Sequence, residues 1–168
     1  MRTSDKIKKK SSIDKDSDSV DSLHDQMVFW LYEKLKYQTN RDIVFEKISE
    51  LRTKGTFKNS FESFELLKLN RFYLSLEIES VIDRSCIADI CLKYIVRKDC
   101  IIHLIIEVKN EYKALEVMRQ INLYKSRCNY SFGIICAPRN DKDKRIFEEQ
   151  GILFIDYPDF FKRNEIEI

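Results

Sequence analysis

Glycine and proline are scarce in this chain, with three glycines and two prolines among 168 residues. The corners and tight turns of β-sandwiches depend on these two residues, so their scarcity argues against a loop-rich sandwich and a low-complexity chain. Apolar residues make up 43% of the chain and aromatic residues 12%. This composition and length are typical of a single folded domain with one core.

The chain also lacks a strong charge of either sign, since 30 basic and 28 acidic residues give a net charge of +2. Composition alone therefore does not indicate a nucleic-acid partner, and any basic surface must arise from local arrangement. No apolar run is long enough to span a membrane, and no secretory signal opens the chain. We expect no membrane contact and a cytoplasmic location.

Cysteine spacing argues against a disulfide framework or structural zinc. The number of cysteines is odd, Cys86 and Cys91 lack the C-x-x-C spacing, and neither histidine is close to these two in sequence. Most of the cysteines lie within apolar runs, which predicts reduced thiols that pack as small apolar side chains. They are Cys86, Cys91, Cys100, Cys128 and Cys136.

The first half of the chain divides into a tail, a helix and an uncertain insert. Residues 1–21 are polar and predict a disordered tail, followed by one domain over 22–168. Apolar residues at steps of three and four predict a helix over 21–37, and Asp42–Glu46 is typical of a short strand. Residues 52–80 are the insert, which we expect to affect substrate choice or oligomerisation.

The insert carries an apolar ridge at helical spacing, formed by Phe57, Phe61 and Phe64. This ridge must be buried against the domain or against a second copy of the chain. Tyr73–Ile78 is compatible both with an extension of that helix and with a strand.

The second half alternates strands and helices after a hairpin. The predicted elements are a hairpin of Cys86–Ile95 and Cys100–Val108, a helix over 111–127, a strand over 132–137, a helix over 142–150 and a strand over 152–155. The second hairpin strand is apolar at odd and even positions, which indicates a central strand covered on both faces. The order predicts an α/β fold, a three-layer sandwich around a central mixed sheet.

Acidic and basic residues follow the apolar runs of the predicted hairpin. Glu107 and Lys109 are two apart on a strand and share one face, whereas Val108 points the other way. Asp89, on the neighbouring strand, is placed to approach Glu107. Two close carboxylates repel each other unless a cation lies between them, and Mg²⁺ prefers such oxygen ligands. We therefore predict a site in which Asp89, Glu107 and the Val108 carbonyl hold the metal and Lys109 orients a water molecule.

The alternative for Glu107 and Lys109 is an exposed ion pair at a strand end, a common arrangement. Gln120 and Tyr124 add to the site hypothesis because they lie four residues apart on one face of the following helix. Their ordinary interpretation is a half-buried tyrosine and a solvated glutamine.

The order Asp…Glu-x-Lys…Gln-x-x-x-Tyr, carried by Asp89, Glu107, Lys109, Gln120 and Tyr124, resembles the PD-(D/E)XK nuclease superfamily. The last element is similar to the motif of its Holliday-junction-resolvase-like and RecB-like branches. The resemblance implies a restriction-endonuclease-like core and catalytic roles for these five residues. It also implies a nuclease, dependent on Mg²⁺ or Mn²⁺, that acts on DNA at a junction, flap or end.

Two details of the family pattern differ or stay open. Ala88 stands where the family name has proline. Many members add an upstream glutamate, for which Glu33 and Glu46 are candidates; we favour Glu46 as a metal ligand. Compact resolvase-like nucleases are commonly dimers, which suggests a homodimer by analogy only. Alternative functions are a non-catalytic nucleic-acid-binding or protein-interaction module, or a restriction-type endonuclease with a separate specificity subunit.

Overall fold

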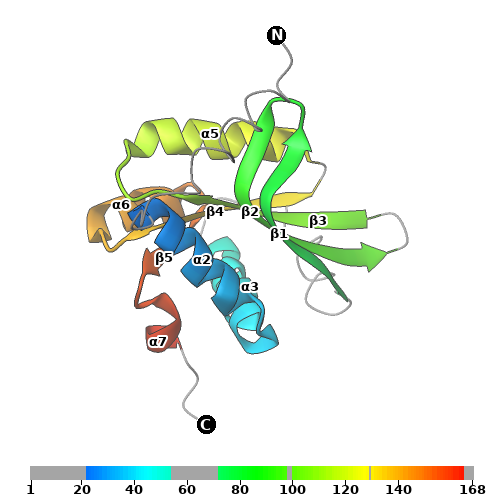
Figure 1. Ribbon diagram of the computed structural model, residues 1–168, viewed down its shortest axis with the longest axis horizontal. Helices are drawn as coiled ribbons and strands as arrows, with labels where there is room; N and C mark the ends of the chain where they lie inside the picture. Colours follow the sequence, from blue (N-terminus) through cyan, green and yellow to red (C-terminus); the bar gives the residue numbers. More distant parts are fainter. Residues whose placement is uncertain (1–21, 54–71, 98–99, 129, 165–168) are drawn as a thin grey trace, which may run out of the picture.

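A five-stranded mixed sheet forms the centre of the computed structural model, which describes residues 22–53, 72–97, 100–128 and 130–164 (Figure 1). The strands lie in the order β1-β2-β3-β4-β5. They are β1 Phe72–Asp83, β2 Cys86–Arg97, β3 Cys100–Val108, β4 Ser131–Pro138 and β5 Leu153–Tyr157. The pairs β1–β2 and β2–β3 are antiparallel, whereas β3–β4 and β4–β5 are parallel. The central position predicted for the second hairpin strand, β3, is confirmed.

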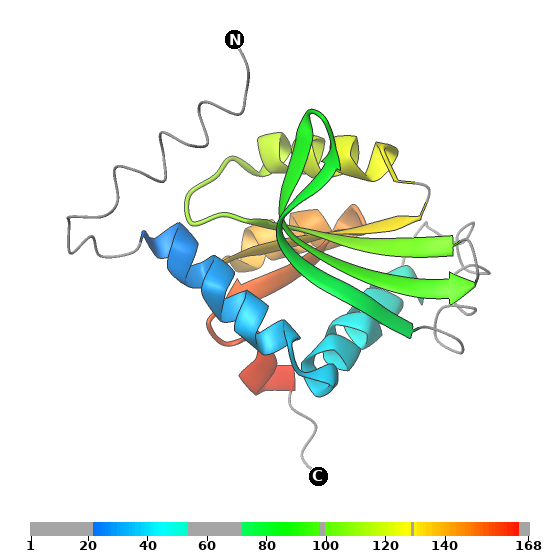
Figure 2. The ribbon, with the colours of Figure 1, turned by 45° about the vertical axis from the view of Figure 1, so that its right-hand side comes forward.

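Helices cover both faces of the sheet (Figures 1 and 2). One face packs against α2 (Leu23–Leu35), α3 (Gln38–Thr53) and α7 (Phe160–Asn164), and the other against α5 (Ala114–Ser126) and α6 (Asp141–Glu149). Side chains of β3 alternate between the two cores, because even-numbered residues contact the α2 side and Ile105 contacts the α5 side. The predicted three-layer α/β sandwich is confirmed. No helix in the described ranges is both long and apolar enough to cross a membrane.

The predicted strand at Asp42–Glu46 is wrong, because these residues lie inside α3. Ile43, Val44 and Phe45 are all buried, which a short strand would also explain. Val44, Ile48 and Leu51, however, recur at steps of four and three and pack into the same core. This helical stripe outweighs the strand preference of β-branched residues, since tertiary burial overrides intrinsic propensity.

Residues 72–80 of the predicted insert form most of β1, an edge strand paired with β2. The choice left open for Tyr73–Ile78 is thus resolved as strand. The ridge of Phe57, Phe61 and Phe64 lies outside the described residues, as does the predicted tail over 1–21.

The β1–β2 hairpin bends out of the sheet in its second half. Pairing of β2 with β3 runs only as far as the Ile90–Ile106 pair, whereas β1 and β2 stay paired beyond it. Glu79, opposite the end of this shared region, has a positive φ of 50°, a strained conformation for a residue with a side chain. Residues 79–89, here called the projecting hairpin, cross towards α5 (Figure 2).

Candidate active site

Asp89 lies where β2 leaves β3. Its Oδ2 accepts a hydrogen bond from the backbone N–H of Val108 at 2.8 Å. Because strand pairing ends at Ile90 and Ile106, this carboxylate satisfies an amide that has passed the end of the β2–β3 ladder. The bond fixes the side chain at the carboxyl end of β3.

Glu107 is almost completely buried, with 1% of its surface exposed. Its Oε2 lies 3.2 Å from Nζ of Lys109, whereas its Oε1 has no hydrogen-bond partner among the described residues. Burial, and then the negative charge of Asp89, raise the pKa of Glu107 above its usual range, against the opposing effect of Lys109. A buried carboxylate with an unpartnered oxygen beside a second carboxylate is an environment that a cation would stabilise.

Val108 and Lys109 follow the alternation expected at the end of a strand. The Val108 side chain is buried in the core under α2, and Lys109 lies on the same face as Glu107. The Lys109 amide donates to the carbonyl of Cys136 at 2.9 Å, so pairing with β4 continues past the end of β3. Two parallel strands therefore hold the backbone that carries Glu107 and Lys109.

Gln120 and Tyr124 contact each other on the side of α5 that faces the site. Gln120 Nε2 donates to the Tyr124 hydroxyl at 2.9 Å. Tyr124 is buried, and its ring packs in a cluster with Ile105 and Ala88. Burial is the main cause that raises the pKa of Tyr124, and the charge of Glu107 adds to it. The tyrosine is thus close to Glu107 and partly a core residue.

The structure places the two upstream glutamates away from this group. Glu46 is exposed on α3, a helix that packs against α7 and β5 rather than against the Asp89 end of β2. Glu33 is half-buried on α2 and pairs with Lys36 at 2.6 Å. In the described part of the chain neither glutamate has a recorded contact with Asp89 or Glu107.

His24 is a neighbour of Asp89 that the sequence analysis missed. Its Nε2 lies 3.5 Å from Oδ2 of Asp89. His24 precedes the buried residues Met27 and Leu31 by three and seven positions, so it belongs to the helix stripe that faces the sheet. From this spacing the sequence could have predicted that His24, in the first turn of α2, faces the strand ends.

Across the described ranges, no three His, Cys, Asp or Glu side chains gather closely enough to form a ready ligand set for a metal. Asp89, Glu107 and the Val108 carbonyl would provide the protein ligands. Mg²⁺ commonly binds through one or two carboxylates and completes its octahedron with water and substrate oxygens. The unpartnered Oε1 of Glu107 fits such an ion.

A cavity of about 210 Å³ opens beside Asp89, between the first turns of α2 and the bend of β1. It is lined by His24, Asp25, Val28, Phe29, Ile78, Glu79 and Asp89. A second cavity of about 340 Å³ begins at Asn110, next to Lys109, and extends to Arg139 and Asn140 at the start of α6. Of the predicted site residues, Asp89 lines the first cavity and none lines the second.

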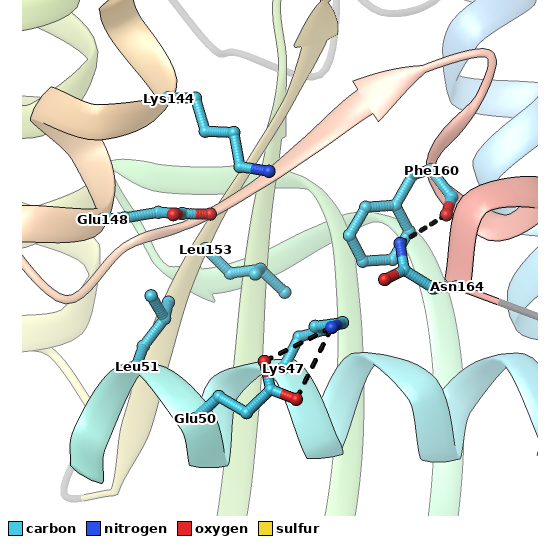
Figure 3. Close-up of a pocket in the computed structure, with 8 residues that line it drawn as sticks. All are labelled: Lys47, Glu50, Leu51, Lys144, Glu148, Leu153, Phe160 and Asn164. Atoms are coloured by element: carbon cyan, nitrogen blue, oxygen red, sulfur yellow. Dashed lines mark hydrogen bonds and ion pairs between the residues drawn. The ribbon is translucent and has the colours of Figure 1, made fainter. Parts of the chain in front are cut away.

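A further pocket of about 250 Å³ lies at the β5 edge, between α3, α6 and α7 (Figure 3). Lys47 pairs with Glu50 at 3.3 Å on its α3 side, and Lys144 and Glu148 extend into it from α6. None of the predicted site residues lines this pocket, so it is separate from the candidate active site.

Comparison with known proteins gives little further information. No family model and no curated protein matches the chain. Among solved structures, a repair endonuclease from Pyrococcus abyssi is similar, with a TM-score of 0.34 and 22% identity. The match covers 59% of this chain and 43% of that chain, less than half of its length. A likeness this weak carries no argument about activity, and the candidate site rests on its own geometry.

Proposed function

We propose that the protein is a nuclease that hydrolyses phosphodiester bonds of DNA with the help of Mg²⁺ or Mn²⁺. The observation that supports this most is the buried Glu107, with one oxygen unpartnered, beside Asp89 and Lys109 at the end of β3. An ion pair with no role beyond the surface is expected to stay exposed. Exposed pairs add little stability, and burying a pair costs desolvation free energy.

Each residue then has a role set by its position. Asp89, Glu107 and the Val108 carbonyl hold the ion, which when bound lowers the pKa of a water molecule and offsets charge on the phosphate. Lys109, 26% exposed and 3.2 Å from Glu107, would orient that water through its ammonium group and offset negative charge on the phosphate. Gln120 and Tyr124 flank the scissile strand, and His24 positions the Asp89 carboxylate.

The main competing function is a non-catalytic module that binds nucleic acid or protein through the same fold. What favours it is that within the described residues no third acidic, histidine or cysteine side chain completes a ligand set. Both functions predict binding, so only cleavage separates them.

A substrate panel tests the proposal. Labelled junction, flap, blunt duplex and single-stranded DNA, with matching RNA, are incubated with Mg²⁺, Mn²⁺ or EDTA. We expect cutting that depends on the divalent ion and is strongest on branched or open-ended DNA. A chain that binds these substrates but cuts none of them under any ion condition is the non-catalytic module instead.

Divalent ions should raise the melting temperature of the wild-type protein. An ion that binds only the folded state at one hundred times its Kd stabilises it by about 2.7 kcal/mol. For a domain of this size that corresponds to roughly 5–10 °C. Melts are recorded with MgCl₂ and with NaCl of equal ionic strength. A shift of the same size in Asp89→Asn would place the ion elsewhere.

Gln120→Ala and Tyr124→Phe should reduce cleavage more than stability. Tyr124→Phe keeps the packed ring and removes one hydrogen bond, so it should cost about 1 kcal/mol of unfolding free energy. We expect a tenfold or larger loss of kcat, because the charge of Glu107 acts on Tyr124 and Gln120 bonds to the tyrosine hydroxyl. Thermal melts alongside cleavage rates separate the effects, with Asn122→Ala on the exposed face of α5 as the control. A large fall in melting temperature with normal kcat would make the pair structural.

A further inference from the structure

The projecting hairpin presents two apolar side chains to solvent. Val81 and Ile87 are cross-strand partners and are 65% and 52% exposed. The opposite face of the same hairpin is already used, since Ile82, Cys86 and Ala88 pack with Tyr124. The exposed pair therefore has no role in the core.

This apolar pair lies close along the chain to residues that border the candidate active site. Val81 follows Glu79 by two positions on β1, and Ile87 precedes Asp89 by two positions on β2. Glu79 and Asp89 line the cavity beside α2, whose wall also contains Phe29, 62% exposed. Exposed apolar side chains therefore lie on both elements that border this cavity, the projecting hairpin and α2.

The tip and the base of the projecting hairpin differ in charge. Arg84 is exposed at the turn of the hairpin. The neighbouring Asp83 is engaged within the turn, where it accepts bonds from Ser85 and Cys86 and pairs with Arg127 at 3.3 Å. Arg84 places a positive charge at the tip, whereas the acids Asp25, Glu79 and Asp89 line the cavity at the base, where the ion would bind.

We propose that the projecting hairpin is a wedge that reads the point where a DNA duplex opens. This inference rests on the proposed nuclease function and specifies its substrate. Val81 and Ile87 contact the flat face of the last base pair, and Arg84 contacts a phosphate. The unpaired strand passes Phe29, which stacks on a base, and reaches Asp89.

The physical basis is that the faces of bases are apolar and are accessible only where stacking ends. Aliphatic side chains at a base step and aromatic side chains under single-stranded bases are both favourable contacts. A continuous duplex offers neither surface, so the wedge gives preference for forks and flaps without reading sequence. A second copy of the chain would bury the apolar pair but gains nothing from an arginine at the tip.

The test uses the double variant Val81→Thr, Ile87→Thr, which keeps β-branched side chains in an exposed strand and removes their apolar ends. The control is Leu115→Gln, Leu123→Gln, two exposed apolar residues of α5. Binding to forked DNA and to blunt duplex of equal length is measured by anisotropy without divalent ions. A 2-aminopurine at the first unpaired position reports stacking, and Phe29→Ala is tested on that signal.

We expect the Thr variant to bind the fork roughly tenfold more weakly and the duplex within twofold of wild type, with the control unchanged. In Phe29→Ala the quenching of 2-aminopurine should be lost. Equal fork binding by wild type and the Thr variant would overturn the wedge even if the enzyme cuts DNA. Loss of a wild-type dimer in the Thr variant, measured by sedimentation, would assign the face to a second copy. A wild-type chain that prefers forks but never cuts would keep the wedge and overturn the nuclease.

Discussion

Glu107→Gln is expected to abolish cleavage while DNA binding stays within about twofold of wild type. The substitution keeps the shape of the side chain and removes the charge that would hold the ion, an interaction worth several kcal/mol in the transition state. A loss of about 4 kcal/mol corresponds to roughly 10³-fold in rate. Binding should survive because affinity for DNA comes largely from contacts with the phosphate backbone elsewhere.

The same variant has a second signature in stability. In the absence of divalent ions, wild type buries a carboxylate beside Asp89, and both burial and that charge disfavour its ionised form. A neutral amide avoids this cost, so Glu107→Gln should melt at or above the wild-type temperature without metal. It should also lose the Mg²⁺-induced shift. Glu116→Gln, an exposed acid on α5, is the matched control. Wild-type cleavage by Glu107→Gln would reduce Glu107 to a structural acid.

Much of the sheet could be predicted from sequence because its central strands have unusual composition. β3 and β4 are apolar on both faces, which few elements other than buried strands require. α5, which connects them, has one apolar stripe, and Gly151, with a φ of 73°, follows the end of α6. The local hydrophobic pattern is therefore sufficient to predict an element whose apolar residues face one core or both cores.

Prediction failed where local pattern and tertiary burial compete. The run Ile43-Val44-Phe45 fits a strand by propensity, and only its packing together with Ile48 and Leu51 decides for a helix. β1 was equally ambiguous, because an edge strand has exposed apolar residues such as Phe72 and Ile78 that blur the alternation. The sequence of β1 alone does not show which of its faces is buried, because that depends on its pairing with β2.

Some contacts of the candidate site also follow from spacing along one element, whereas others depend on how distant elements pack. Glu107 with Lys109, and Gln120 with Tyr124, are neighbours by spacing along one element, and the structure places each pair in contact. The approach of His24 to Asp89 depends on how α2 crosses the end of the sheet. The bend at Glu79, which creates both the cavity and the projecting hairpin, has no marker in the sequence, since glycine would be the usual residue there.

Gly133→Ala should destabilise the protein, although alanine is normally preferred to glycine within a strand. A Cβ at Gly133 would lie 2.3 Å from Cγ2 of Ile121, a branch close to the backbone of α5 that cannot swing aside. Overpacking of this kind costs about 1–3 kcal/mol, which exceeds the 0.5–1 kcal/mol gained from reduced chain entropy. The melting temperature should fall by roughly 3–10 °C. An increase would show that α5 is free to move off β4.

The close approach at Gly133 also positions the candidate site, because Ile121 directly follows Gln120 and lies three residues before Tyr124 on α5. Displacing Ile121 should move both side chains away from Glu107 and lower kcat beyond the loss of folded protein. Ile121→Ala removes the clashing branch but leaves a cavity, at a cost of about 2–5 kcal/mol by itself. The double variant Gly133→Ala, Ile121→Ala should lose less unfolding free energy than the sum of the losses in the two single variants, since the new methyl group fills part of that cavity. Simple additivity in the melts of the double variant would mean that Gly133 and Ile121 are not packed against each other, and that α5 is held over the sheet by other contacts.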